Sequence, residues 1–414
     1  MNAGLSSKLI SRLYLLMGIL AGFHIRVTEA QDPVAAAQST HGPLRTVTIH
    51  AEVPEGVGTI FITGNRPEIG NWNPSGLAMS GSGTNRTTVL QLPTGTQLEY
   101  KFTLGSWDRE GLGPSGTILP NHRLLVETNQ EVTIVIPSFR KALAEYLDDW
   151  RGSGVLGRLE YWKDMPSKFL NAVRNVEIWT PPDYEENSTN RYDVLYMQDG
   201  QNLFDPRIAS TGVDWGVDEA VVRGVKSGRL APLIVVGIWC TDRRAMEYSP
   251  WHLGTNYAKF LIEELMPKVN QRFRTRTGPE HTGVMGSSLG GLISFWLCWQ
   301  YPKVFGRAGC LSTHFPWTGK LPPDTGGPPL IELEIARGAT FPHGVRLYFD
   351  YGTRGIDATY EPMQAKVNAW LTGQGLKPGE DFIARKFEGA DHNEAAWRAR
   401  LDNPLTFLFG LPPR

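Results

Sequence analysis

Ser288 lies in a pattern of residues suited to acyl-transfer chemistry. Residues 284–291 read Val-Met-Gly-Ser-Ser-Leu-Gly-Gly and fit Gly-x-Ser-x-Gly, with Ser288 as the central serine. In such a turn, small residues let the backbone pass sharply from a strand into a helix and leave the serine hydroxyl exposed. The amide of Leu289 can then donate to an oxyanion. Because the chain contains 45 glycines, the pattern alone is a weak signal, and the partners of the serine must decide.

The predicted base is His392. A serine hydroxyl is a poor nucleophile at neutral pH and needs a base within hydrogen-bond reach. His392 follows the last predicted strand in a short polar loop, and α/β-hydrolases place their histidine last, in the order Ser, acid, His. An ordinary histidine of a surface loop is the alternative. His281 precedes the serine in the sequence, and His314 is expected to line the cleft.

The acid of the triad should follow the strand predicted at 345–349. Asp350, Asp357 and Glu361 are the candidates. Asp350 lies directly at the end of the strand, whereas the glycines before Asp357 form a loop that could turn its carboxylate toward His392. We therefore predict Asp357 as the acid. Capping of the next helix by the same side chain is the alternative.

A second oxyanion donor is expected at Gly200 or Gln201. A strand predicted at 194–197 ends there in a glycine turn, and an oxyanion hole combines the amide after the nucleophile, here that of Leu289, with an amide from another loop. Asp199 either braces this loop or caps it.

Strands and helices alternate along the C-terminal part of the chain. The predicted strands are 176–179, 194–197, 233–238, 281–285, 345–349 and 382–387, and the predicted helices are 257–273, 292–300, 360–371 and one from 394 onward. This alternation predicts an α/β fold with a mostly parallel sheet covered on both faces. Catalytic groups of such sheets lie beyond the carboxyl ends of the strands.

The preceding part of the chain has a different texture. Residues 44–138 contain short alternating strands separated by Gly, Pro and Asn, which predicts a small all-β sandwich. Residues 139–171 are interpreted as a connector and 172–414 as the hydrolase domain.

The N-terminus has the layout of a secretory signal. Lys8 and Arg12 precede the apolar run 13–23, and Ala30 follows a short polar tract. We predict a signal peptide over 1–30, cleaved near Ala30, a flexible leader over 31–43, and an exported protein, secreted or periplasmic. The apolar run is too short to cross a bilayer about 30 Å thick as a helix, and a retained anchor is the alternative. No later segment has the pattern of a membrane span.

Composition narrows the classes of partner and cofactor. The 41 basic and 42 acidic residues nearly cancel, so charge gives no argument for binding nucleic acid or an anionic membrane. The three cysteines cannot form a disulfide framework. No Cys-x-x-Cys or His-Glu-x-x-His spacing is present, so no zinc or other metal site is expected.

The C-terminal part resembles the putative esterase (esterase D-like) family of the α/β-hydrolases. The matching segments are 175–184, 196–205, 244–248, 286–291 and His392. The family includes feruloyl, acetyl-xylan and siderophore esterases as well as mycolyl transferases. The resemblance implies a triad of Ser288, Asp357 and His392 and no metal or organic cofactor. The acid is the least certain residue to carry over, because the family's acid loop varies in length.

The N-terminal part resembles a starch-binding module, carbohydrate-binding module family 20. The matching segments are 61–74, 98–102 and 107–108. The resemblance implies a sugar site made by Trp72, Lys101 and Trp107, in which flat indole faces cover a glucose ring. The segment after Asp108 is longer than usual in that family, which leaves a role for Asn121 open, and core tryptophans kept for packing are the alternative.

Three functions follow from these residues. The first is an exported serine esterase that hydrolyses carboxylic esters, on or near a polysaccharide held by the module. The second is a catalytically inactive α-glucan-binding protein, and the third is an acyltransferase that uses the same triad. The sequence leaves the ester open among feruloyl, acetyl, siderophore and other esters. It leaves Trp215, Trp251 and Trp317 open between cleft and core.

Overall fold

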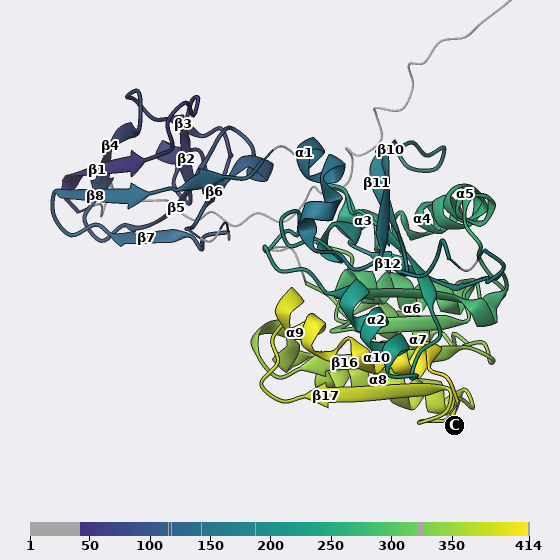
Figure 1. Cartoon of the computed structure of the whole chain (residues 1–414). Coiled ribbons are helices and arrows are strands. Elements are labelled where there is room, and N and C mark those ends of the chain that lie inside the picture. The colour runs from purple at the N-terminus through teal and green to yellow at the C-terminus, as the bar shows by residue number, and fades with distance from the viewer. Residues whose placement is uncertain are drawn as a thin grey trace, which may run out of the picture.

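The computed structural model describes residues 42–412, except 115, 117, 142, 187 and 321–325. The predicted signal peptide and residues 31–41 of the predicted leader lie outside the described residues. The chain forms a small N-terminal β lobe and a larger α/β lobe, joined by a connector that contains helix α1, Leu143–Asp148 (Figure 1).

The β lobe consists mainly of two facing sheets. One has the strand order β4-β1-β8 and the other the order β3-β2-β5-β7. Their bounds are β1 Leu44–Glu52, β2 Phe61–Gly64, β3 Leu77–Ala78, β4 Asn85–Pro93, β5 Gln97–Thr103, β7 His122–Leu125 and β8 Gln130–Val135. Alternate side chains of the strands, among them Val47, Ile49 and Ile62, point into one buried core. The predicted β-sandwich is therefore confirmed.

An eight-stranded sheet forms the centre of the α/β lobe, in the order β10-β11-β13-β12-β14-β15-β16-β17. Its strands are β10 Arg158–Met165, β11 Arg174–Thr180, β12 Asp193–Gln198, β13 Leu233–Ile238, β14 Thr282–Ser287, β15 Arg307–Leu311, β16 Arg346–Gly352 and β17 Phe382–Phe387. The pairs β10–β11 and β11–β13 are antiparallel, and all other pairs are parallel. The mostly parallel sheet predicted from the sequence is confirmed.

Helices cover both faces of this sheet and bury two separate apolar clusters. They are α2 Val217–Lys226, α3 Arg244–Glu247, α4 Gly254–Lys259, α5 Met266–Arg272, α6 Leu289–Gln300, α7 Leu330–Ala336, α8 Glu361–Gly373, α9 Glu394–Arg400 and α10 Asp402–Phe409. Figure 1 shows α6 and α8 against the sheet and α9 beside the carboxyl end of β17. No helix in the described part of the chain has the length and apolar character needed to cross a membrane.

Two segments differ from the sequence interpretation. The predicted connector 139–171 contributes β10, which pairs with β11 as the edge of the sheet, so the sheet begins within that segment. The helix predicted at 257–273 begins at Gly254 and contains a π-helical stretch, Phe260–Leu265. Pro267 follows that stretch and has no N–H to donate to the carbonyl four residues earlier, which accounts for the local rearrangement.

Candidate active site

Ser288 occupies a strained corner between β14 and α6. Its backbone has φ 57° and ψ −122°, a left-handed conformation that side chains rarely adopt. The neighbouring glycines permit the corner, since a Cβ at Gly286 would come within 2.7 Å of the Gly290 carbonyl carbon, and one at Gly291 within 2.8 Å of Thr313 Oγ1. The Ser288 amide donates to the Leu311 carbonyl at 3.0 Å, which ties the corner to β15. The serine is thereby presented at the carboxyl end of the sheet.

His392 and Asp357 meet at the same end of the sheet. Asp357 lies in the turn Gly355–Thr359 after β16, and its Oδ1 is 2.6 Å from His392 Nδ1. The carboxylate is fully buried, which would raise its pKa, but hydrogen bonds from His392, Ser312 and the Gly352 amide outweigh burial and lower the pKa of Asp357. Asp357 therefore carries its charge beside the imidazole, and this charge holds the Nδ1–H tautomer.

The two other candidate acids have different partners. Asp350 is buried and accepts from Arg400 Nη2 at 2.9 Å, and burial raises its pKa. Glu361 accepts from Lys386 Nζ at 2.9 Å on the surface. The first residue of helix α8 follows Tyr360, and the Asp357 side chain makes no capping hydrogen bond to this helix. Of the three candidates, only Asp357 is brought to His392.

Ser312 holds the far side of the Asp357 carboxylate. Its hydroxyl donates to Asp357 Oδ2 at 2.6 Å and accepts from Trp397 Nε1 at 3.0 Å and from Arg400 Nη2 at 2.8 Å. Ser312 also has positive φ, 42°. The same Arg400 nitrogen bonds Asp350, so the two buried carboxylates share one guanidinium. This network fixes the acid without exposing it to water.

The loop predicted to supply the second oxyanion donor lies beside β13. Asp199 has a left-handed backbone, φ 55°, and its carboxylate forms a two-point ion pair with Arg244, at 2.7 and 2.8 Å. A Cβ at Gly200 would meet the Gly237 carbonyl carbon at 2.5 Å, so glycine is required there. Within the described residues no acceptor is assigned to the amides of Gly200, Gln201 or Leu289. Asp199 thus braces a loop whose amides remain available.

Two further residues at this site were not singled out as catalytic candidates from the sequence. The Tyr360 side chain interacts with that of Ser288, its hydroxyl lies 2.8 Å from His314 Nδ1, and its ring centroid is 5.8 Å from that of His392. Burial, together with the nearby charges of His392 and Arg244, lowers the pKa of His314 to about 4. His314 follows β15, which pairs with β14, the strand that ends before Ser288. Its place after a strand of the sheet was the signal in the sequence that could have marked it as a site residue. His281 instead pairs with Asp193, 2.8 Å away.

The predicted sugar-site residues gather on the β lobe. The rings of Trp72 and Trp107 are 6.4 Å apart at their centroids, and Lys101 pairs with Glu110 at 2.7 Å. All three predicted residues, together with Asn121, line a cleft of ≈ 520 Å³. Trp72 has φ 64°, so its indole is presented on strained backbone. The cleft also includes residues of the α/β lobe, among them Gln201.

Other chemically suggestive groups have structural explanations. Trp215 and Trp317 are buried in the core, and Trp251 is partly buried against it. Cys240 lies 3.0 Å from the Gln201 side chain, and burial raises the pKa of its thiol to about 12.

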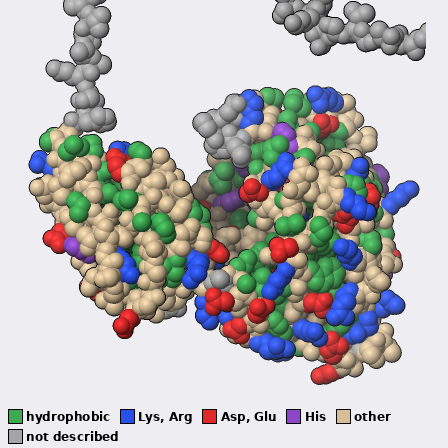
Figure 2. Space-filling view, turned by 90° about the horizontal axis from the view of Figure 1, so that it is seen from above, with side chains coloured by type: hydrophobic (Ala, Val, Ile, Leu, Met, Phe, Trp, Pro, Cys, Tyr) green, Lys and Arg blue, Asp and Glu red, His purple; other side chains and the backbone are tan. Residues whose placement is uncertain are grey.

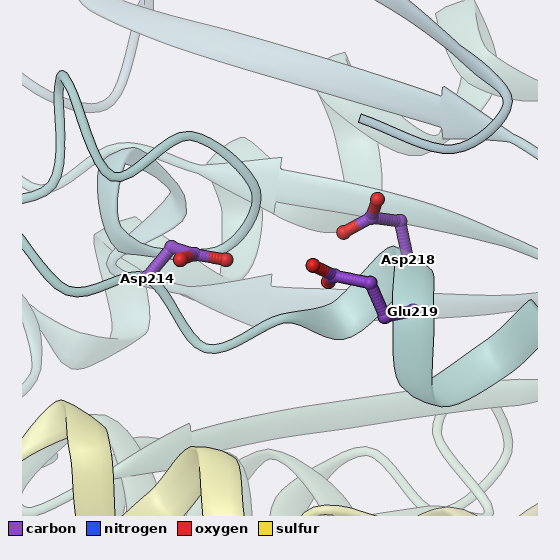
Figure 3. A group of neighbouring side chains, drawn as sticks. All are labelled: Asp214, Asp218 and Glu219. Atoms are coloured by element: carbon purple, nitrogen blue, oxygen red, sulfur yellow. The ribbon is translucent and has the colours of Figure 1, made fainter. Parts of the chain in front are cut away.

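One acidic cluster lies outside the candidate active site. The ligand atoms of Asp214, Asp218 and Glu219 lie within 4.8 Å of one another (Figure 3). Arg398 already binds Asp214 at 2.6 Å and Glu219 at 2.9 Å. Burial and a hydrogen bond shared with Glu219 raise the pKa of Asp218 to about 8. The Arg398 guanidinium and a proton on Asp218 therefore offset two of the three negative charges of this cluster.

Comparison with known proteins follows this division of the chain. Residues 167–408 match the family model described as Putative esterase, which covers more than half of the chain. The chain belongs to the Putative esterase family. Residues 46–133 of this esterase-family chain match the model of the Starch binding domain. Both predicted resemblances are confirmed. The first also confirms the predicted enzyme class, carboxylic ester hydrolase, which is the class of the family.

Individual relatives are distant. The esterase-family chain is 28% identical over 152 residues to the uncharacterized protein YbbA of Bacillus subtilis, covering 34% of this chain and 56% of that one. It is 24% identical over 206 residues to an endo-1,4-beta-xylanase/feruloyl esterase of Xylanibacter ruminicola, covering 46% and 26%. The enterobactin esterase of Shigella flexneri aligns with a TM-score of 0.49 at 17% identity, over 90% of this chain and 95% of that chain. The chain thus spans about half the length of the first relative and about a quarter of the second.

Proposed function

We propose that this esterase-family protein is an exported serine esterase that hydrolyses carboxylic esters on or near a polysaccharide. The observation that carries the proposal is the strained Ser288 corner, which shares one end of the sheet with the His392–Asp357 pair at 2.6 Å. Strain of this kind is retained where the surrounding structure supports it and function uses it. Asp357, the carboxylate of that pair, is buried and ionised, as an acid that orients a catalytic histidine must be.

In the proposed reaction, Ser288 Oγ attacks the ester carbonyl while His392 accepts its proton. The imidazolium is stabilised by Asp357, which does not itself take the proton. The amides of Leu289 and of Gly200 or Gln201 donate to the oxyanion. His392 then protonates the departing alcohol, and water activated by the same histidine releases the acid from the serine.

Tyr360 has a supporting role in this proposal. Its side chain interacts with that of Ser288, and its hydroxyl lies 2.8 Å from His314 Nδ1. Because the low pKa of His314 keeps this imidazole neutral at neutral pH, no second positive charge competes with His392 beside the nucleophile. Tyr360 and His314 are therefore assigned to orienting the serine before attack.

The polysaccharide part of the proposal is supported by the Starch binding domain match. A relative of the chain, the endo-1,4-beta-xylanase/feruloyl esterase of Xylanibacter ruminicola, joins a xylanase to a feruloyl esterase, as its name states. Trp72, Lys101 and Trp107 are proposed to bind an α-glucan, and export is supported by the signal-like N-terminus.

A panel of esters tests the proposal. p-Nitrophenyl acetate, methyl ferulate and acetylated xylan are supplied to the wild type, to Ser288→Ala and to Ser287→Ala, a control at the buried neighbouring serine. We expect the wild type and Ser287→Ala to hydrolyse at least one ester and Ser288→Ala to hydrolyse none measurably. Equal turnover by Ser288→Ala would remove the proposed nucleophile.

A further inference from the structure

We propose that the β lobe and the α/β lobe form one composite cleft, which binds the sugar chain of an acylated glycan and directs its ester bond toward Ser288. This inference rests on the proposed function, and it names the substrate class: an ester whose alcohol part is a sugar within a neutral oligosaccharide.

Three parts of the chain line the cleft of ≈ 520 Å³. The β lobe contributes the tryptophan pair Trp72 and Trp107, and the connector contributes Lys141 and Tyr146. The α/β lobe contributes Gln201 and Ser210. The aromatic platform of the module therefore faces the other lobe, where a sugar stacked on it would have a second wall. Figure 2 shows the two lobes as separate masses that meet along one side.

Contacts between the two lobes hold them in this arrangement. Arg140, directly after β9 (Ser138–Phe139), donates to the Arg207 carbonyl at 2.7 Å and lies 3.5 Å from Glu110 of the β lobe. Ile118 of the β lobe packs on Gly212 of the α/β lobe. A Cβ added at Gly212 would come within 3.3 Å of the Ile118 side chain. Hydrogen bonding, charge and packing thus all cross between the lobes.

The α/β wall of the cleft adjoins the loop of the candidate oxyanion donors and the helix that follows His392. Gln201 directly follows Gly200, and the Ser210 amide donates to Asn202 Oδ1 at 2.8 Å. The adjacent Thr211 hydroxyl donates to Glu394 Oε2 at 3.0 Å, two residues after His392. In the proposed reaction His392 protonates the departing alcohol, and the composite cleft places that alcohol on the side of this wall. A sugar hydroxyl is the alcohol that the aromatic platform can hold.

The charges of the cleft favour a neutral ligand. Lys101 and Arg140 are both paired with Glu110, at 2.7 and 3.5 Å. Asp108 and Lys141 add one charge of each sign. The five charged residues that line the cleft, three basic and two acidic, leave a net charge of +1, so a highly charged polymer gains little here. Hydroxyl groups, by contrast, find donors and acceptors of both kinds.

A block placed on the α/β side tests the composite cleft. Ser210 is exposed, so Ser210→Trp can fill the cleft without disturbing a core, and Lys141→Trp does the same from the connector. Ser227→Trp is the matched control, because Ser227 is an exposed serine that caps the end of α2 and lies outside the cleft. Trp107→Ala removes the platform on the module side. The probes are binding of maltoheptaose to the full chain and hydrolysis of mono-acetylated maltoheptaose, compared with p-nitrophenyl acetate.

We expect Ser210→Trp and Lys141→Trp to weaken maltoheptaose binding and to lower the ratio of kcat/KM for the acetylated sugar to that for p-nitrophenyl acetate, each by about tenfold, mainly through KM. Ser227→Trp should match the wild type. If both blocking variants bind and turn over the sugar like the wild type while Trp107→Ala does not, the module binds glycan alone and the composite cleft is refuted. A wild type inactive on both esters would instead contradict the proposed esterase, and the binding measurement would still decide the cleft.

Discussion

Ser288 and Trp72 both lie on left-handed backbone, with φ of 57° and 64°, yet the surroundings that hold them differ. Such conformations cost on the order of 1–3 kcal/mol each for residues other than glycine. Around Ser288 the strain is held by crowded glycines and by backbone hydrogen bonds to Leu311 and His314, beside the end of β15. Around Trp72 it is held by a loop, whose main tie is the bond from the Trp72 amide to the Gly64 carbonyl at 2.7 Å.

This difference in support determines how the two regions should respond to substitutions. In the candidate active site, three of the six described non-glycine residues with positive φ are brought together: Asp199, Ser288 and Ser312. Each is tied to a buried strand end, so the reacting groups are positioned before substrate arrives. The sugar-facing rings are partly exposed and make few fixed contacts. Changes at the first region should act nearly all-or-none, and changes at the second should be graded.

The largest effect is expected at the nucleophile and its base. Ser288→Ala and His392→Ala should each lower kcat by about 10⁴-fold or more, and the double variant should lose no more than either alone, because the groups act as one unit. Steady-state kinetics on p-nitrophenyl acetate measure all three. Multiplicative losses in the double variant would contradict a shared proton transfer.

Asp357→Asn comes next, with an expected loss in kcat of about 10²–10⁴-fold, because an amide no longer stabilises the imidazolium or holds its tautomer. Glu361→Gln is the matched control, since Glu361 was an alternative acid and pairs with Lys386 on the surface. Its kcat should stay within about twofold of the wild type. A reversed order of the two variants would assign the acid to Glu361.

A smaller, graded effect is expected on the sugar face. Trp72→Ala should weaken maltoheptaose binding by about tenfold through loss of one stacked ring, without changing hydrolysis of p-nitrophenyl acetate. Val89→Ala, at an exposed residue of β4, is the control and should bind like the wild type. Isothermal titration calorimetry gives both affinities. Unchanged binding by Trp72→Ala would make this ring a packing residue and remove the contrast between the regions.

The smallest effect concerns His314 and acid stability. Its pKa is lowered from 6.5 to about 4, so between these values the unfolded chain binds a proton that the folded chain does not. The free energy of unfolding therefore falls as pH falls through this window and is fully retained above it. The loss attributable to His314 is on the order of 2 kcal/mol. Urea unfolding of His314→Gln at pH 7 and pH 4.5 should show a weaker pH dependence than the wild type; an identical dependence would contradict a buried neutral His314.

The elements with strong local patterns were predictable from the sequence. The strands at 233–238 and 382–387 have the predicted bounds, because their apolar or alternating runs are bounded by clear breaks. Strand β10 was missed as part of the sheet because it is an edge strand with polar, partly exposed residues. Strand β15 was missed because it is short and rich in small residues, with Gly309 packed against the Met285 side chain.

The residues of the candidate site were predictable where they directly follow a strand that can be recognised in the sequence. The motif around Ser288 and the loop of His392 follow strands that the sequence marks. Ser312 and Arg400 were not predictable, because their hydrogen bonds join residues 45 or more positions apart. The glycines before Asp357 favoured it over Asp350, but the contacts that hold its carboxylate against His392 and Ser312 join residues far apart in the chain.

The most direct test of the central claim is to identify the residue that a fluorophosphonate modifies. The full chain is treated with the probe, digested and analysed by mass spectrometry, with Ser288→Ala as the control. We expect one modified serine, Ser288, no modification in the control, and loss of esterase activity in proportion to labelling. Labelling of a different residue, or full activity in a protein completely modified at Ser288, would contradict the claim.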